Sequence, residues 1–506
     1  MVHAIPPPKT VDTRYPSSVM EMKSLPLEKS DAVAFGMIAL FTIIRLAVAP
    51  AFGLGVDEAH YFLYAKYLDL SYVDHPPLVG WAHLPLYRLF GTNELLVRIP
   101  PIFLFALVSF LCYRFITAVA GSKSIAVLAV AALNGSFILN AMSLMLLPDC
   151  FLLALIFPLV SVIKKIEDTG HWKYFVFLGI ILGTAGLAKY TAILFVLPLC
   201  IYYILKKRYS LLFSGRMVMA AVIALTMVSP VLYWNLQHDF VSFSYQTGRV
   251  LGPSKPSIGS FFTSLLAQFG AYSPFLFIIA FYGFFRSFKA KNDDIRLSLL
   301  FGATILIFFL YSSLFEQTLP HWPSLFYLLF IPIGVHFLMA DGSRRKRIFL
   351  YFSIAFSLTV TLFLYAELQA KWFPFPDYQS PFREIYGLPS IAGDANAILR
   401  ENSNSKKAVA VTNWTMGSRV IYYSLPYRQD VFVIDRRKDQ FDFWEKESPT
   451  GYDLLFINTH FHQEDVARSF KCQSTEPVKT KDILLNGTKV DTVEYVWCRN
   501  FQGFKE

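Results

Sequence analysis

Charged residues are scarce in this chain of 506 residues, because Asp, Glu, Lys and Arg together make up only 16% of it. A soluble domain has about a quarter of its residues charged, so this composition excludes a soluble protein for most of the length. Hydrophobic residues make up 55%. The net charge of +10 does not indicate nucleic-acid binding, because the basic residues lie in short clusters between apolar runs, not in a stripe with aromatic side chains.

Several short motifs are also absent. The sequence has no HExxH, and it has no GxxxxGK[ST] phosphate-binding loop, which argues against ATP hydrolysis. His460 and His462 are two residues apart, which is weak as metal-ligand spacing. The first 30 residues lack the apolar core and cleavage site of a signal peptide. We therefore expect residues 1–31 to form a cytoplasmic leader.

Cysteine is rare, with five residues in the chain. Cys112, Cys150 and Cys200 lie in or beside apolar runs, where we expect packed core residues. Cys472 and Cys498 lie in the polar C-terminal part and could form a disulfide in an oxidising compartment. Spacing alone does not determine the geometry of the two residues, so a disulfide and two free thiols both stay open.

Apolar runs long enough to cross about 30 Å of hydrocarbon are abundant. Lysine and arginine are unequally divided between the turns that join these runs. With the N-terminus in the cytoplasm, the cytoplasmic segments hold 20 of them and the opposite short loops hold 5, which supports that orientation. We expect eleven spans, at 32–52, 95–119, 124–146, 148–163, 174–188, 190–205, 217–235, 258–285, 297–315, 324–340 and 348–366.

An odd number of spans places the C-terminal part on the outer face. Short apolar runs at 408–411, 431–434 and 454–457 alternate there with helical patterns. The sequence thus predicts an α-helical polytopic membrane domain over 32–366 and an extracytoplasmic α/β domain over 367–506. In a bacterium this is a multi-pass inner-membrane protein with a periplasmic C-terminal domain.

The first external loop, 53–92, is too long for a simple connection. Its two amphipathic stretches, 58–70 and 77–90, are suited to helices lying in the membrane interface. Asp57 and Glu58 stand where the first of these begins. One interpretation is a base that takes a proton from an incoming hydroxyl or amine, and the other is a helix N-cap.

The tetrapeptide Asp74-His75-Pro76-Pro77 predicts a phosphate site. A residue before proline is extended, and proline favours the first turn of a helix. His75 should therefore lie just before a helix N-terminus, where free amides attract anions. The alternative is that Asp74 merely caps that helix.

Two isolated charges, Asp149 and Lys189, lie at the outer ends of apolar runs. Ionisable groups at such positions are candidates for function, although snorkelling to the interface is the alternative for Lys189. Arg45 lies inside the first span, where it is either a functional group or a side chain that snorkels to the interface.

Polar residues also follow the seventh and ninth spans. His238, Gln246 and Arg249 lie among aromatics, a mixture that suits sugar and phosphate binding and equally an interfacial aromatic belt. His321 follows Glu316 in the later segment. All these candidates lie on one face of the membrane, which indicates a single site.

Taken together, these motifs resemble those of the GT-C glycosyltransferases that use polyprenyl-phosphate sugars, including the bacterial lipid A aminoarabinose transferases and the protein O-mannosyltransferases. The resemblance covers roughly residues 32–340. It is carried by VDEAHY at 56–61, DHPPLVGW at 74–81, LPDC at 147–150, GLAKYTA at 186–192, YWNLQHDFVSF at 233–243 and PHWPSLFY at 320–327.

The resemblance implies transfer of a sugar, with inversion, from an undecaprenyl-phosphate type of carrier to a lipid A or lipopolysaccharide acceptor. It assigns acceptor activation to Asp57, carrier-phosphate contact to His75, and site roles to Asp74, Asp149 and Lys189. The aminoarabinose transferases have lysine where His75 stands. Because histidine is less reliably charged near neutral pH, we expect Lys189 to contribute more than His75 to neutralising the carrier phosphate. The departure also leaves the identity of the donor sugar open.

Two alternatives remain: protein O-glycosylation, and a non-enzymatic flippase or transporter for lipid-linked sugars. Transporters tend to have internal repeats with charges near the midplane, and no repeat is visible here. The expected partners are the lipid-linked donor, a lipid or glycan acceptor and membrane lipids, and not nucleic acid. No cofactor is certain, and a divalent metal among Asp57, Asp74, His75 and His238 stays open.

Overall fold

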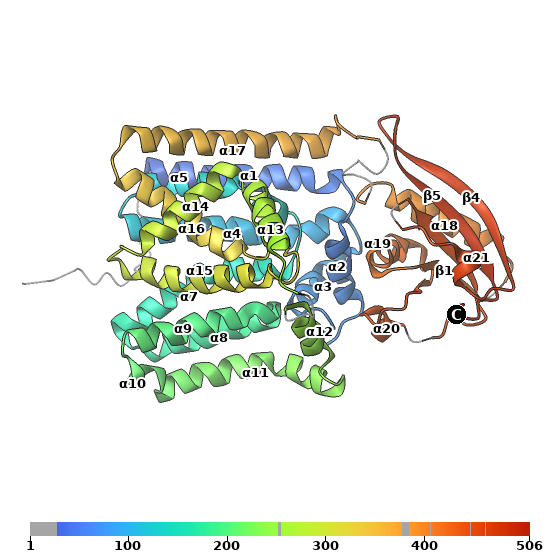
Figure 1. Ribbon diagram of the computed structural model, residues 1–506, viewed down its shortest axis with the longest axis horizontal. Helices are drawn as coiled ribbons and strands as arrows, with labels where there is room; N and C mark the ends of the chain where they lie inside the picture. The colour runs from blue at the N-terminus through green and yellow to red at the C-terminus, as the bar shows by residue number, and fades with distance from the viewer. Residues whose placement is uncertain are drawn as a thin grey trace, which may run out of the picture.

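The computed structural model describes residues 28–250, 255–376, 384–404, 406–445, 447–460 and 462–505, with the side chains of 249 and 250 excepted. Nearly all of the expected leader lies outside these ranges. Figure 1 shows a bundle of long helices at one end of the molecule and a small domain with a sheet at the other. Two short helices and the polypeptide around them lie between the two parts.

Helices occupy every run that the sequence predicts to be a span. Within the described ranges, five helical segments are long and apolar enough to cross a membrane, or six if one bent pair counts as a span, and four more apolar helices are shorter. Eleven crossings therefore stay a prediction. The bundle consists of α1 Lys29–Val48, α4 Glu94–Ala120, α5 Lys123–Gly135, α6 Phe137–Met142, α7 Pro148–Thr169, α8 Trp172–Ala188, α9 Ile193–Leu205, α10 Tyr209–Leu212, α11 Gly215–Gln237, α12 Val241–Val250, α13 Ile258–Ala271, α14 Pro274–Ser287, α15 Asp293–Ser312, α16 Ser324–Ala340 and α17 Arg344–Ala370.

The predicted span over 258–285 is not one continuous helix, and whether it crosses the membrane stays a prediction. This run forms two helices, α13 and α14, bent by 108°. Ser273 between them has a φ of 72°, and Pro274 begins the second helix. Because proline cannot donate a backbone hydrogen bond and restricts the residue before it, the first helix ends here. The run 124–146 is likewise divided, at Ser136 between α5 and α6.

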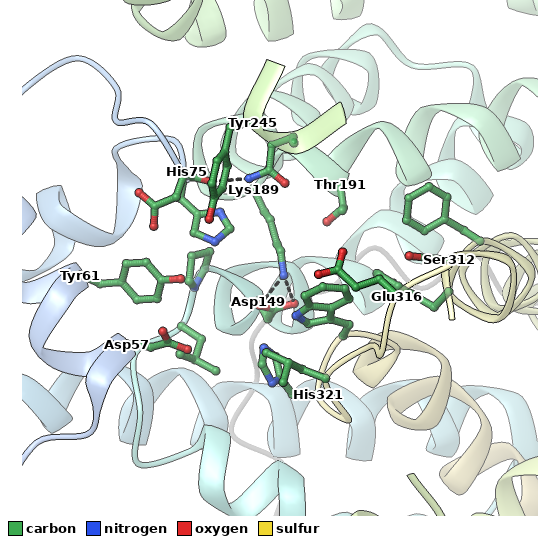
Figure 2. Close-up of a pocket in the computed structure, with 18 of the residues that line it drawn as sticks. Asp57, Tyr61, His75, Asp149, Lys189, Thr191, Tyr245, Ser312, Glu316 and His321 are labelled. Carbon is green, nitrogen blue, oxygen red and sulfur yellow. Dashed lines mark hydrogen bonds and ion pairs between the residues drawn. The ribbon is translucent and has the colours of Figure 1, made fainter. Parts of the chain in front are cut away.

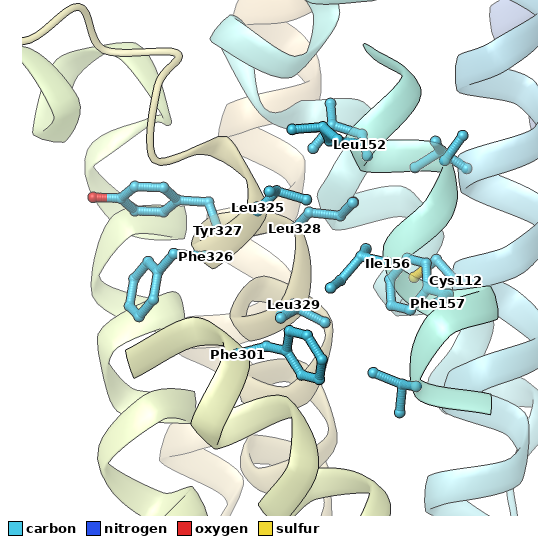
Figure 3. Packing of buried hydrophobic residues seen from close by; sticks show 14 of the residues in the cluster. Cys112, Leu152, Ile156, Phe157, Phe301, Leu325, Phe326, Tyr327, Leu328 and Leu329 are labelled. Carbon is cyan, nitrogen blue, oxygen red and sulfur yellow. The ribbon is translucent and has the colours of Figure 1, made fainter. Parts of the chain in front are cut away.

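The core of the bundle surrounds α16, which is buried from Ser324 to Val335. Figure 3 shows Leu325, Leu328 and Leu329 of this helix facing Ile156 and Phe157 of α7. Close approach relies on Gly334, where an added Cβ would lie 2.2 Å from the carbonyl oxygen of Ile279 on α14. Small residues at helix contacts are the usual means of tight packing within a membrane.

Arg45 has a structural role inside the bundle. Its guanidinium is buried and donates to the side-chain oxygens of Asn134 and Asn140 and to the hydroxyl of Tyr365. It also lies over the ring of Phe105, 4.7 Å from the centroid. A buried cation needs such partners, and these contacts join α1, α5, α6 and α17 away from the site described below.

The first external loop forms two helices, α2 Val56–Lys66 and α3 Leu78–Phe90, close to the predicted ranges. Most side chains of the first helix are buried within the protein, and its expected position at the membrane interface stays a prediction. It packs against α3 and against α19 Trp414–Ser424 of the C-terminal domain. This helix therefore connects the two parts of the molecule.

The C-terminal part is an α/β domain, as predicted. Its sheet has the strand order β2-β1-β3-β5-β4; β1 pairs in parallel with β2 and β3, and β5 pairs antiparallel with β3 and β4. Cys472 and Cys498 form a disulfide. The elements besides α19 are α18 Leu388–Glu401, β1 Lys407–Val411, β2 Val431–Val433, α20 Phe441–Trp444, β3 Asp453–Thr459, α21 Val466–Ser469, β4 Ser474–Leu485 and β5 Thr488–Arg499.

Candidate active site

A cavity of about 350 Å³ lies where the helical bundle meets α2 and the C-terminal domain. Figure 2 shows its charged and aromatic side chains converging from separate segments of the chain. The cavity collects seven of the ten predicted site residues: Asp57, Asp74, His75, Asp149, Lys189, Gln246 and His321.

The neighbouring carboxylates Asp57 and Glu58 have different surroundings. Gly55 is the N-cap of α2, and its amide donates to Glu58 at 2.9 Å. Glu58 also accepts two hydrogen bonds of 2.9 Å from the guanidinium of Arg98, and both side chains are fully buried. The carboxylate of Glu58 therefore caps α2 and belongs to a buried ion pair, which favours the structural interpretation, and a role of Glu58 at the site stays a prediction. Asp57 lines the cavity.

Asp74 is held by groups on two elements, α2 and α12. Its carboxylate accepts a hydrogen bond from the hydroxyl of Tyr64 and lies 3.3 Å from Nε2 of His60. Its carbonyl oxygen accepts from the amide of Gln246 on α12 at 2.5 Å. Burial favours the neutral carboxyl, but the charges of His60 and His75 and the Tyr64 hydrogen bond outweigh it and hold the pKa of Asp74 well below its usual value. Asp74 is thus an ionised group with a constrained position.

His60 extends this network into the C-terminal domain. Its Nδ1 lies 3.0 Å from Oγ of Ser418 on α19, and that hydroxyl donates to the carbonyl oxygen of Trp414. A hydroxyl has one proton to donate, so Nδ1 is the donor to Ser418. The C-terminal domain thereby helps to orient the histidine that faces Asp74.

Asp149 and Lys189 form an ion pair on the cavity wall. Asp149 lies in the first turn of α7 after Pro148, and Lys189 caps the C-terminus of α8 in an extended conformation. The ammonium donates to both carboxylate oxygens, at 2.8 and 2.7 Å. Both side chains are more than 90% buried, and the snorkelling alternative for Lys189 is therefore wrong.

His75 and His321 reach the cavity from two loops. The ring of His75 packs edge-on against Tyr61, with centroids 5.4 Å apart, and lies before α3 as predicted. His321 belongs to the turn before α16. Two histidines, a lysine and a glutamine amide thus surround the space with potential donors to an anion.

Besides Glu58, two predicted residues are not part of the described lining. His238 caps α11 and stacks on Trp234, with centroids 4.0 Å apart, so it belongs to a packed aromatic group. The side chain of Arg249 lies outside the described residues. Within the described part of the chain, no three His, Cys, Asp or Glu side chains gather as metal ligands, and the suggested set containing His238 does not assemble.

Sequence reasoning missed several lining residues. Tyr61 could have been found, because it lies one helical turn after Asp57 and shares its face. Tyr245 lies beside Gln246 on α12. Trp414 and Arg437 come from the C-terminal domain, and Arg437 donates to the hydroxyl of Tyr245 at 3.2 Å. No local motif marks these two residues.

Comparisons with known proteins find glycosyltransferases among the similar sequences. Residues 74–234 match the family model described as dolichyl-phosphate-mannose-protein mannosyltransferase. Over 267 residues the chain is 26% identical to the lipid A galacturonosyltransferase RgtD of Rhizobium johnstonii, a match that covers 50% of this chain and 54% of that protein. The chain therefore matches about half the length of this curated relative.

Two solved structures share the fold. ArnT from Cupriavidus metallidurans bound to undecaprenyl phosphate superimposes with a TM-score of 0.63 at 14% sequence identity, covering 91% of this chain and 97% of that one. Its apo state gives a TM-score of 0.59 at 15% identity over the same shares. The predicted GT-C type of fold is confirmed, including the α/β domain after the membrane helices.

Proposed function

We propose that this chain is a membrane glycosyltransferase that moves a sugar from a polyprenyl-phosphate carrier to a lipid A or lipopolysaccharide type of acceptor. The observation that carries the proposal is the cavity that joins Asp57, His75 and the Asp149–Lys189 pair where the bundle meets the C-terminal domain. Support comes from the glycosyltransferase relatives, one of which acts on lipid A and another of which was solved with undecaprenyl phosphate.

In the proposed reaction, Asp57 removes the proton from an acceptor hydroxyl. The hydroxyl oxygen forms a bond to the anomeric carbon while the bond from that carbon to the carrier phosphate oxygen breaks. The leaving phosphate takes the electron pair, and the anomeric configuration inverts. His75 and Lys189 bind this phosphate, and stabilising its charge is the largest electrostatic task of the site.

Asp74 and Asp149 have positioning roles in this scheme. The oxygens of Asp74 accept from Tyr64 and face His60, and those of Asp149 accept from Lys189. A carboxylate that already accepts such strong hydrogen bonds is a weak base. Asp57 is the candidate base because it lines the cavity from the first turn of α2.

The proposed location is the bacterial inner membrane, with the site and the C-terminal domain in the periplasm. The charge distribution between turns supports this orientation. The Cys472–Cys498 disulfide agrees with it, because such bonds persist in oxidising compartments.

The test is transfer by the purified chain in liposomes. Undecaprenyl-phosphate carriers bearing galacturonic acid, aminoarabinose or mannose are supplied with lipid A, and mass spectrometry measures the sugar added. We expect one carrier to serve as donor, and Asp57→Asn to reduce transfer about 10²–10⁴-fold, the usual contribution of a general base. Glu401→Gln, on an exposed carboxylate of α18, is the matched control.

The alternatives give different results. Addition of sugar to a peptide and not to lipid A would indicate protein O-glycosylation. Movement of a labelled lipid-linked sugar across the membrane without any transfer would indicate a flippase and overturn the proposal. Near-normal transfer by Asp57→Asn would remove this residue from the mechanism.

A further inference from the structure

A second cavity, of about 360 Å³, lies at the other end of α2. Lys66 and Tyr67 line it from the C-terminus of that helix, and β2, α20 and their flanking residues supply the rest. Asp57 and Tyr61 of the same helix line the candidate active site. With 1.5 Å of rise per residue, the two linings are roughly 8–15 Å apart along α2.

Aromatic side chains form much of the wall. The rings of Tyr67 and Trp444 stack with centroids 4.8 Å apart, and those of Phe432 and Tyr452 meet edge-on at 5.4 Å. Aromatic rings present an apolar face, and tyrosine and tryptophan add a polar edge. Such a wall suits a ligand with both apolar C–H faces and hydroxyl groups.

The polar groups of this cavity include two buried atoms without a hydrogen-bond partner among the described residues. They are the indole N–H of Trp444, a donor, and Oε1 of Gln429, an acceptor. An unsatisfied buried polar atom costs about 1–3 kcal/mol, so native proteins seldom retain one without a reason. Both atoms have almost no accessible surface, so they lie behind the cavity wall and do not by themselves indicate a ligand.

Charge excludes a phosphate as that ligand. The cavity contains the carboxylates of Asp430, Glu445 and Glu447 against the single ammonium of Lys66. The candidate active site also has carboxylates, those of Asp57, Asp74, Asp149 and Glu316, but Lys189, Arg437 and two histidines lie among them. The second cavity therefore offers an anion fewer cationic partners than the candidate active site does.

We infer that the second cavity is a saccharide subsite, which takes an uncharged or amine-bearing sugar ring. We assign this ring to the glycan part of the acceptor, an assignment that rests on the proposed function. The reacting hydroxyl then lies at Asp57 while a neighbouring sugar is bound beside Lys66 and Tyr67. The C-terminal domain, which contributes most of this lining, thereby selects glycan acceptors.

The inference is tested by saturation-transfer NMR on the full chain in nanodiscs, with D-glucosamine, D-glucose and glucose 6-phosphate as probes. The double variant Asp430→Asn/Glu447→Gln removes two exposed carboxylates of the lining without changing side-chain volume. We expect it to weaken glucosamine binding about tenfold, the effect of losing about 1.4 kcal/mol of interaction. Glu401→Gln/Glu494→Gln, at exposed carboxylates elsewhere in this domain, should bind as the unaltered chain does.

Three results would overturn the inference: no sugar binding by the unaltered chain, equal binding by the lining variant, or tighter binding of the phosphorylated sugar. Binding needs no turnover, so Asp57→Asn should retain it. A chain that binds sugars without transferring them would therefore contradict the proposed function alone. A chain that transfers sugar without binding the probes would contradict this inference alone.

Discussion

The ammonium of Lys189 donates hydrogen bonds to both carboxylate oxygens of Asp149, at 2.8 and 2.7 Å, across 40 positions of sequence. Two helix ends, the start of α7 and the end of α8, are joined by this buried pair on the cavity wall. Removing one partner of such a pair leaves an uncompensated buried charge. The contact therefore affects both stability and chemistry, and paired substitutions can separate the two.

Lys189→Met is expected to destabilise the fold by about 3–5 kcal/mol and to abolish sugar transfer, because it leaves Asp149 charged and alone. Asp149→Asn/Lys189→Met should regain most of the stability, because neither charge remains, without regaining transfer. Thermal unfolding in detergent and the transfer assay measure the two effects. Recovery of transfer in the double variant would show that the lysine is only structural.

His60→Phe is expected to move the acidic limb of the pH–rate profile to higher pH. His60 lowers the pKa of Asp74, so its loss raises that pKa and lets Asp74 take up a proton at a higher pH than in the unaltered chain. His60→Gln, which can still donate to Asp74, should restore part of the profile. A profile unchanged in His60→Phe would show that the ionisation of Asp74 does not control the rate.

Glu58→Gln and Asp57→Asn should have opposite effects although the residues are neighbours. Glu58→Gln breaks a fully buried ion pair with Arg98 and should lower stability by about 3–5 kcal/mol. Asp57→Asn should lower the unfolding temperature less than Glu58→Gln does, and it should reduce transfer. Thermal unfolding of both purified variants, beside their transfer rates, checks the assignment. A Glu58→Gln variant that is stable but inactive would contradict the structural role assigned to Glu58.

Glu445→Gln should stabilise the C-terminal domain at pH 8 and not at pH 5. Burial, followed by the charges of Asp442, Asp439 and Asp435, raises the pKa of Glu445 to about 7, although the amide of Val433 opposes this. A carboxyl whose pKa is raised by folding adds to the free energy of unfolding at low pH. That contribution is lost as the pH rises from about 4.5 to 7. We expect the unfolding temperature at pH 8 to rise by about 2–4 °C. An equal change at pH 5 would contradict the assigned ionisation.

The membrane helices and the candidate loop could be predicted because they depend on composition and local order. Apolar length determines whether a segment can cross the bilayer. Proline at 76 and 77 indicated where α3 begins, and His75 lies before it as expected. Asp149 and Lys189 were recognised as charges at the edges of apolar runs, which the bilayer makes costly unless they are paired or functional.

The roles of adjacent or distant residues could not be predicted in the same way. Asp57 and Glu58 have the same chemistry, and only the rotation of about 100° per helical residue separates the cavity face from the face that meets Arg98. The placement of Trp414 and Arg437 depends on how the C-terminal domain packs on α2, a contact between segments more than 300 positions apart.

By itself, then, the sequence determined the polytopic helical architecture, the α/β domain and seven of the residues that line the candidate site, because hydrophobicity and turn chemistry act locally. Only the tertiary structure decided which carboxylates are paired, how the C-terminal domain completes the cavity and where the second cavity lies. Those features come from contacts between side chains far apart in the chain, and packing in three dimensions selects them.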